Sequence, residues 1–377
     1  MADEADVNRT SSLGWIYVVV SDTRSPGPRQ PVPSWLPGSA VVVYGSLLAV
    51  VGILLNATVL GASLAAGKGS AVPPVRRLLT ANLAVIHLSA AVLVLPAGVV
   101  TEALGRWTFG ADACRAWLLA QVLLIAGAMW SLVGLDVDCL LRVVAPRRGY
   151  AVLAERHHRP VTSVIAITSW VVAGLAVLPI GLAVVIRQAG TDVDNTPVLE
   201  DVCAVTLSPG AVIAQSLAAF LLPAALGLTG SVAIVACKVI APDRGQYSKP
   251  TAVAGVSTAC VLLWLPFFVL YTLLPFCGDG LCIDPATWTL FAWIGRSTLV
   301  VAQAVWFVDP ALRSDVRHLN RLVRRRFSRC SGCWRGFRGN VTSSVSDGVG
   351  KALDDSSACV MSVAKYQIHQ PAQQQQQ

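Results

Sequence analysis

Seven long apolar segments constrain this chain more than any other feature of its sequence. They occupy approximately residues 38–66, 76–103, 113–145, 161–186, 209–240, 250–275 and 286–311. A helix rises about 1.5 Å per residue, so about 20 apolar residues cross the hydrocarbon core of a bilayer, and each segment is near or above that length. Because lipid does not tolerate unpaired backbone groups, these segments are predicted to be transmembrane helices in an all-α bundle.

The composition supports a membrane protein and argues against a nucleic-acid-binding protein. Hydrophobic residues make up 54% of the 377 residues and charged residues 13%, whereas soluble domains carry about 25% charged residues. The formal net charge is +8, but Lys and Arg lie between and after the apolar segments rather than in one patch. The basic charge therefore indicates contact with membrane lipids and not with nucleic acid.

The distribution of Lys and Arg predicts the orientation. With the N-terminus outside, 22 of the 29 Lys and Arg residues lie on the inner side and 6 on the outer side, and Arg296 lies within the seventh segment. This bias follows the positive-inside rule. We therefore expect a multi-pass protein of the cell membrane with an extracellular N-terminus and a cytoplasmic C-terminus.

Four regions follow from this topology. They are an extracellular tail, a seven-helix domain, an amphipathic juxtamembrane helix and a disordered cytoplasmic tail, at residues 1–37, 38–311, 312–330 and 331–377. The first carries a glycosylation sequon at Asn8. In the third, apolar residues recur at helical spacing between arginines, which is typical of a helix on the lipid surface. Cys330 and Cys333 beside it are candidates for palmitoylation rather than for a metal site.

An ordered set of landmarks in these segments resembles the rhodopsin-like (class A) G-protein-coupled receptors. The landmarks are Gly52 and Asn56, Asn82-Leu83-Ala84, Trp107 and Phe109-Gly110 before Cys114, Asp138 with Pro146, Trp170, Leu222-Pro223, Trp264-Leu265-Pro266-Phe267 and Asp309-Pro310. The resemblance covers about residues 38–330 and implies a seven-helix receptor, similar to divergent orphan or herpesvirus-encoded members.

The departures from the family pattern concern its activation switches. The DRY motif reads Asp138-Cys139-Leu140, so its arginine is missing, and NPxxY reads as DPxxR with Asp309 and Arg313. His87 stands where the family carries the sodium-binding aspartate. The switch residues assigned through this resemblance are His87, Asp138, Cys139, Arg142, Trp264, Asp309 and Arg313. Arg142, one turn after Asp138, is the substitute expected to contact a G protein.

The resemblance also guides the pairing of the four cysteines on the outer side. Oxidation is allowed there, but four cysteines can pair in three ways. The family pattern implies a disulfide between Cys114 and Cys203 that ties the third helix to the second outer loop. Cys277 and Cys282 would then close a local loop.

A ligand pocket is expected near the outer ends of the helices. Counting from the landmarks, Gln121 occupies the position where amine receptors carry an aspartate, so an ammonium ligand would lack a counter-ion. The expected pocket residues are Trp117, Gln121, Gln215, Phe267, Phe268, Tyr271, Trp293, Arg296 and Gln303. The aromatic members are equally consistent with core or interface-belt residues. Arg296 is expected either to contact a ligand or to pair with Glu102 or Asp284.

These features predict an atypical receptor, not an enzyme, without a cofactor or metal. Outer segments carry 12 acidic residues against 6 basic ones, which favours a basic peptide or chemokine-like ligand. A heterotrimeric G protein or arrestin is the expected inner partner. The alternative is a non-signalling scavenger, or a partner that forms a dimer with another receptor on the same scaffold.

One pairing inside the bundle is also predicted. His87 and Asp309 occupy positions that the family packs together, and either group alone would be costly to bury. We expect them to share a proton or form an ion pair. Arg313 is the rival partner for Asp309, and Asn56 or a backbone carbonyl the rival for His87.

Overall fold

The computed structural model describes residues 17–20, 38–66, 70–144, 156–189, 203–240, 250–276 and 285–341. Asn8, Cys277 and Cys282 lie outside these residues. Cys330 and Cys333 lie within a helix but in a part whose side chains are not described. The glycosylation, palmitoylation and second disulfide therefore stay predictions.

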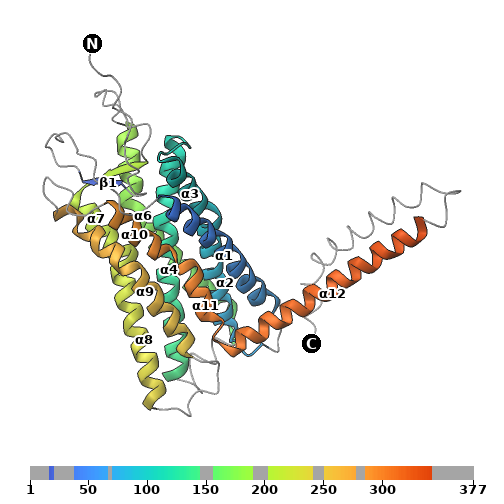
Figure 1. The fold of residues 1–377 in the computed structure, drawn as a ribbon. Coiled ribbons are helices and arrows are strands. Elements are labelled where there is room, and N and C mark those ends of the chain that lie inside the picture. Colours follow the sequence, from blue (N-terminus) through green and yellow to red (C-terminus); the bar gives the residue numbers. More distant parts are fainter. Residues whose placement is uncertain are drawn as a thin grey trace. The chain divides into compact units, whose positions relative to one another are not determined.

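The described chain is almost entirely helical (Figure 1). In order, its elements are β1 (Tyr17–Val20), α1 (Gly38–Ala65), α2 (Pro74–Ser89), η1 (Ala90–Val94), α3 (Leu95–Leu104), α4 (Ala111–Val144), α6 (His158–Ala189), β2 (Ala204–Leu207), α7 (Pro209–Ser216), η2 (Leu217–Leu221), α8 (Leu222–Ile240), α9 (Pro250–Leu273), η4 (Leu274–Phe276), α10 (Pro285–Arg296), α11 (Thr298–Trp306) and α12 (Pro310–Val341).

Within the described residues, six helical stretches are long and apolar enough to cross a membrane. A seventh candidate joins residues 286–306 to α12, with a bend of 91° at the break between them. Large apolar side chains are exposed along the helices; on α6 they recur at Val164, Ile167, Val171 and Leu175. Spaced by three or four residues, they cover one helix face, which is the pattern of a face turned to lipid. The predicted bundle of transmembrane helices is confirmed.

The third apolar segment, α4, lies inside the bundle. It packs against α2, α6, α8 and α9 (Figure 1). Leu132 and Leu135 on α4 are fully buried, as are Leu83 and Ile86 on α2 and Phe220 between α7 and α8. Four helices thus pack around α4, as its length and position in the sequence suggest, while α1 packs on α2, α3 and α11.

Two prolines shape their helices through short π-helical segments. Pro96 follows η1 and Pro223 follows η2. A proline lacks the backbone N–H that would bond the carbonyl four residues earlier, and its ring clashes with that carbonyl. A π segment changes the hydrogen-bond register just before the proline and so accommodates both effects.

A two-stranded parallel sheet is the feature that the all-α expectation missed. β1 pairs with β2 in the register Tyr17 to Ala204 through Val20 to Leu207. β2 begins one residue after Cys203, whose disulfide holds this stretch against the first turn of α4. The apolar run at residues 17–20 is rich in β-branched valine, which favours a strand but is too short to be diagnostic.

The chain divides into two compact units, residues 1–319 and 320–377. The first contains the bundle and the first turns of α12, and the second begins with the remainder of that helix. α12 ends at Val341, beyond the boundary at residue 330 expected from the sequence. Its arginines and apolar residues alternate at helical spacing over the expected part, which explains why that part was recognised.

Candidate functional site

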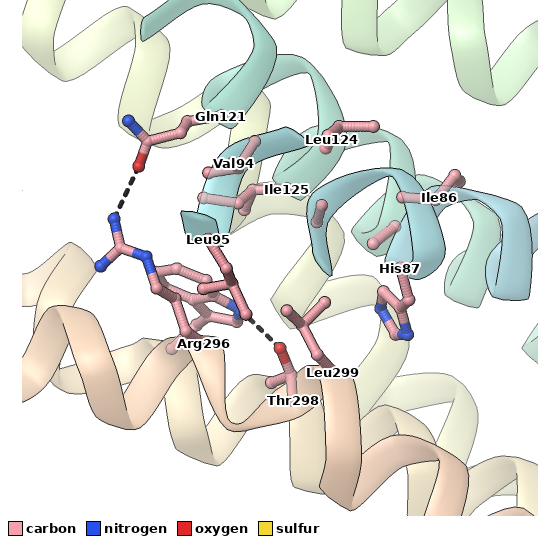
Figure 2. A pocket seen from close by; sticks show the side chains of 13 residues that line it. Ile86, His87, Val94, Leu95, Gln121, Leu124, Ile125, Arg296, Thr298 and Leu299 are labelled. Atoms are coloured by element: carbon pink, nitrogen blue, oxygen red, sulfur yellow. Dashed lines mark hydrogen bonds between the residues drawn. The ribbon is translucent and has the colours of Figure 1, made fainter. Parts of the chain in front are cut away.

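A cavity lies in the bundle on the side of the Cys114–Cys203 disulfide, which we call the disulfide end. Its volume is about 50 Å³, and it is lined mainly by apolar side chains. Its lining residues, drawn as sticks in Figure 2, are Ile86, His87, Ala90, Val94, Leu95, Gln121, Leu124, Ile125, Ala128, Trp264, Arg296, Thr298 and Leu299. We call it the Arg296 cavity after its charged group.

Arg296 and Gln121 meet across this cavity (Figure 2). Nη2 of Arg296 donates a hydrogen bond to Oε1 of Gln121 over 2.7 Å, and both residues are about 95% buried, with exposed fractions of 5% and 4%. The guanidinium also lies over the ring of Trp293, 5.1 Å from its centroid. Glu102 is close enough to interact with the charge of Arg296. A buried cation therefore sits beside the residue that replaces the amine-binding aspartate.

Regular helix geometry places the cavity residues. Leu124, Ile125 and Ala128 lie three, four and seven residues after Gln121, so all four share one face of α4. On the opposite wall, Nε1 of Trp264 donates to Oγ1 of Thr298 over 3.2 Å. Most of this apolar wall was not predicted from the sequence, although the helical spacing from Gln121 is a signal that could have indicated it.

A disulfide and two packed tryptophans lie at the disulfide end, beside the cavity. Cys114 and Cys203 are bonded, with their Cα atoms 5.5 Å apart, which confirms the pairing implied by the family resemblance. Trp107 lies 5.3 Å from Trp117, whose Nε1 donates to the carbonyl of Val94 over 3.1 Å. Trp117 is thus a buried structural neighbour of the cavity and does not line it.

Most other predicted pocket residues form an aromatic cluster between α7, α9 and α10. Phe267, Phe268 and Tyr271 contact one another, and Trp288 joins them. The hydroxyl of Tyr271 donates to Oε1 of Gln215 over 3.1 Å. These residues and Trp293 are buried but do not line the cavity, which brings together Gln121 and Arg296 of the nine predicted pocket residues.

His87 reaches Gln303 and not the predicted Asp309. Nδ1 of His87 lies 3.1 Å from Nε2 of Gln303, and both side chains are buried. Gln303 is six residues before Asp309, or about 9 Å along a helix. The predicted His87–Asp309 pair is therefore wrong, because Asp309 lies beyond the end of α11, too far along the seventh segment for His87.

Asp309 instead pairs with Arg76 near the start of α12, at what we call the Pro310 end of the bundle. Nη2 of Arg76 lies 3.2 Å from Oδ2 of Asp309, and both side chains are buried. Oδ1 of Asp309 accepts the backbone N–H of Ala311 over 2.9 Å, and Arg76 lies over the ring of Trp306 at 5.5 Å. Arg313, the expected rival partner, is exposed. Arg76 was not predicted as a partner because it stands at the start of the second apolar segment, where it was counted with the charges of the inner loop.

A second ion pair lies close to the first. Nε of Arg142 donates to both carboxylate oxygens of Asp138, each over 3.1 Å. The two residues are one helical turn apart on α4, where side chains are neighbours. Arg76 is near enough to Asp138 and Cys139 to interact electrostatically with both. Arg142 is thus occupied by Asp138 in this conformation, and Arg76 is the guanidinium beside the cysteine that replaces the family's arginine.

Within the described part of the chain, no group of three or more His, Cys, Asp and Glu side chains is placed to hold a metal ion. The chemistry of the Arg296 cavity is instead that of a hydrogen-bonding cation on an apolar wall. Such a wall with a few polar groups is typical of a binding site for an organic ligand. The Pro310 end instead carries paired charges on α2, on α4 and just before α12. Such ion pairs are typical of contacts that hold helices in one conformation.

Comparison with known proteins agrees with this architecture. The profile of the family described as 7 transmembrane receptor (rhodopsin family) matches residues 56–301. The D(1) dopamine receptor of Carassius auratus is 26% identical over 309 residues, covering 69% of this chain and 80% of that protein. The D(1A) dopamine receptor of Didelphis virginiana is 25% identical, covering 67% of this chain and 65% of that protein, slightly less than two-thirds of its length. The 5-hydroxytryptamine receptor 5A of Rattus norvegicus is 23% identical, covering 58% of this chain and 71% of that protein.

Proposed function

Because the chain belongs to the rhodopsin family of seven-transmembrane receptors, we propose that it is a cell-surface receptor for a peptide-like ligand rather than an amine. In this proposal the disulfide end is extracellular and the Pro310 end faces the cytoplasm. The observation that carries the proposal is the hydrogen bond between Arg296 and Gln121 inside the cavity.

The charge at this position disfavours an amine. An ammonium group beside Gln121 would meet the guanidinium of Arg296 in place of the aspartate that amine receptors carry there. Two like charges 4 Å apart repel by about 4 kcal/mol at an effective dielectric constant of about 20. The relatives that are named as dopamine and 5-hydroxytryptamine receptors therefore indicate the scaffold, while this cavity favours a different ligand class.

A peptide-like ligand matches the charges of both layers of the proposed binding region. Its carboxylate, at the C-terminus or on an acidic side chain, would accept charge-assisted hydrogen bonds from Arg296. Its basic groups would be attracted by the 12 acidic residues of the outer segments, most of which lie outside the described residues. The cavity then selects the end of the ligand, and the outer segments steer it.

The Pro310 end is proposed to contact a G protein through altered switches. Cys139 cannot supply the guanidinium of the family motif, and Arg142 is paired with Asp138 in this conformation. Arg76 lies near Cys139 and is held by Asp309. Opening this end would release at least one of these arginines for an inner partner.

The test is a signalling assay in cells that display the full chain. The stimuli are dopamine, serotonin and a library of synthetic peptides made in pairs with free and amidated C-termini, read against a panel of G proteins and arrestin. Peptide activation that needs a free carboxylate and falls at least ~30-fold in Arg296→Gln supports the proposal, since truncating a buried charge contact costs about 2 kcal/mol or more.

Arg115→Gln is the matched control, because Arg115 is an exposed arginine at the same end, paired with Asp112 over 3.0 Å. Activation by dopamine or serotonin that survives in Arg296→Gln would contradict the proposal. Peptide uptake with no G-protein or arrestin response would instead support the scavenger alternative.

A further inference from the structure

Asp136 is a buried acid that the receptor motifs do not account for. It lies on α4, two residues before Asp138, and its exposed fraction is 2%. α8 presents glycine backbone to it: a Cβ atom added to Gly230 would lie 3.1 Å from Cβ of Asp136, and one added to Gly227 would lie 3.6 Å from its Oδ2. From α9, the side chain of Ser257 faces the carboxyl group. The acid therefore sits where α4, α8 and α9 meet.

Neither oxygen of Asp136 has a hydrogen-bond partner of ordinary geometry among the described residues. The hydroxyl of Ser257, which is also buried, lacks one too. Asp138 is the useful contrast, because it is on the same helix and just as buried but accepts two hydrogen bonds from Arg142. Two carboxyl groups that are close in sequence thus differ in their hydrogen bonding: a guanidinium donates to Asp138, and none of the described residues donates to Asp136 with ordinary geometry.

The titratable groups near Asp136 do not neutralise a negative charge. α4 contributes the thiol of Cys139 and α9 the thiol of Cys260. Both thiols are close enough to Asp136 to interact with its charge. α8 contributes glycine at the contact, and its next titratable residues, Cys237 and Lys238, lie about two turns beyond Gly230. Arg142, the basic residue one to two turns further along α4, is directed to Asp138.

We propose that Asp136 is a proton-binding site at the junction of α4, α8 and α9, loaded in the conformation described here. An ionised carboxylate in the interior of a membrane protein is costly unless it is paired or wet, whereas a protonated one is a neutral group of the same shape. The protonated carboxyl can also donate to the hydroxyl of Ser257. The bound proton removes the charge that the site leaves uncompensated.

The site links the proton to the position of α8 and α9. If either helix moves away from α4, water reaches the carboxyl group, which then releases its proton to the solvent and becomes a carboxylate. The closed arrangement binds one proton more than the open one, so raising the pH favours the open arrangement. By the same linkage, anything that holds α8 and α9 against α4 favours the protonated form.

Thermal unfolding of the purified full chain in lipid nanodiscs, from about pH 5 to pH 9, tests the site. A carboxyl group in water titrates near pH 4, so a folded state that keeps its proton above that value loses stability as the pH rises. Asp136→Asn copies the neutral group. We expect its Tm to exceed that of the unmodified protein by several degrees at alkaline pH, and the difference to vanish toward acidic pH.

Asp138→Asn is the matched control, and it should lower the Tm at every pH because it removes an ion pair. A pH-independent difference between Asp136→Asn and the unmodified protein would overturn the proposal. So would failure of Asp136→Asn to fold, since an isostere of the protonated acid should fit.

Two further measurements separate a proton from other ligands. Infrared spectroscopy of the folded protein should show a protonated-carboxyl band that is lost in Asp136→Asn, and an unchanged band would contradict the proposal. The unfolding series is repeated at fixed pH with sodium chloride or N-methylglucamine chloride at equal ionic strength. Stabilisation by sodium that Asp136→Asn abolishes would assign the site to a metal cation instead.

Discussion

The two ends of the bundle each bury an arginine on a tryptophan, but they give it different partners. Arg296 lies over Trp293 and hydrogen-bonds the amide of Gln121, whereas Arg76 lies over Trp306 and pairs with the carboxylate of Asp309. Both side chains are about 95% buried. The environments are similar in packing and differ in the charge of the side chain that accepts these hydrogen bonds, although Glu102 also interacts with the charge of Arg296.

This difference separates a binding contact from a structural one. An acceptor of full negative charge holds a guanidinium strongly, and breaking such a buried pair is costly. A neutral amide holds it less strongly and exchanges more readily for a ligand carboxylate. Arg76 therefore fits a clamp between α2 and the start of α12, and Arg296 fits a ligand contact.

The strongest test of the clamp is Asp309→Asn. This change keeps the oxygen that accepts from Ala311 but removes the charge that faces Arg76, so it should destabilise the protein by about 3–5 kcal/mol. Thermal unfolding of the purified protein measures the effect. Arg115→Gln, which breaks an exposed pair with Asp112, should cost less than about 1 kcal/mol.

A double variant makes this test specific. Arg76→Met together with Asp309→Asn should recover much of the loss, because no buried cation is then left without its carboxylate. Losses that simply add would show that the two residues act separately, and the two ends would then not differ in the way we describe.

The disulfide end is held by a covalent bond where the Pro310 end is held by charge. Cys203→Ser should lower stability by about 2–5 kcal/mol and reduce surface display, because the bond closes a long stretch of chain. Flow cytometry of intact cells measures the display. Cys237→Ser, which removes a free thiol, is the control, and equal display of the two variants would contradict the structural role of the bond.

The sequence predicted the bundle, its central helix and the Cys114–Cys203 bond. These predictions rest on the length of the apolar segments and on the order of the landmark residues, and both can be recognised in a single sequence. It also drew attention to Gln121 and Arg296, because a polar or charged group within an apolar segment stands out. The apolar residues of the cavity wall do not stand out in this way, and the helical spacing from Gln121 is the signal that indicates them.

The polar partners inside the bundle were harder to predict, because they depend on the depth of each residue. A chain pattern shows that His87 and Asp309 are unusual, but helix register decides that His87 meets Gln303 while Arg76 meets Asp309. If the depth of a residue in the bundle is misjudged by about two helical turns, the wrong partner is assigned to it. Arg76 was missed for a related reason: a basic residue at the start of a segment resembles an ordinary loop charge.

The histidine between the two ends offers a smaller perturbation. Gln303→Leu should cost about 1–3 kcal/mol, since it leaves the buried ring nitrogen of His87 without its partner. The effect on Tm should be below that of Asp309→Asn. His87→Leu combined with Gln303→Leu should restore part of the loss, and a double variant that is worse than the sum would exclude a paired role.

The smallest expected change in stability, about 1 kcal/mol, is the most direct test of the comparison between the ends. Gln121→Glu, which has the same length and shape, gives Arg296 a charged acceptor like that of Arg76, and hydrogen bonds to charged groups contribute about 1 kcal/mol more than neutral ones. We expect a slightly higher Tm and a weaker response to the free-carboxylate peptides, because the new acid competes with the ligand for the guanidinium. Gln121→Asp withdraws the charge by one methylene and serves as the control for geometry. If Gln121→Glu leaves the peptide response unchanged, Arg296 is a structural group like Arg76. If it instead creates a response to dopamine, the acid at residue 121 is sufficient to select an amine on this scaffold even beside an arginine.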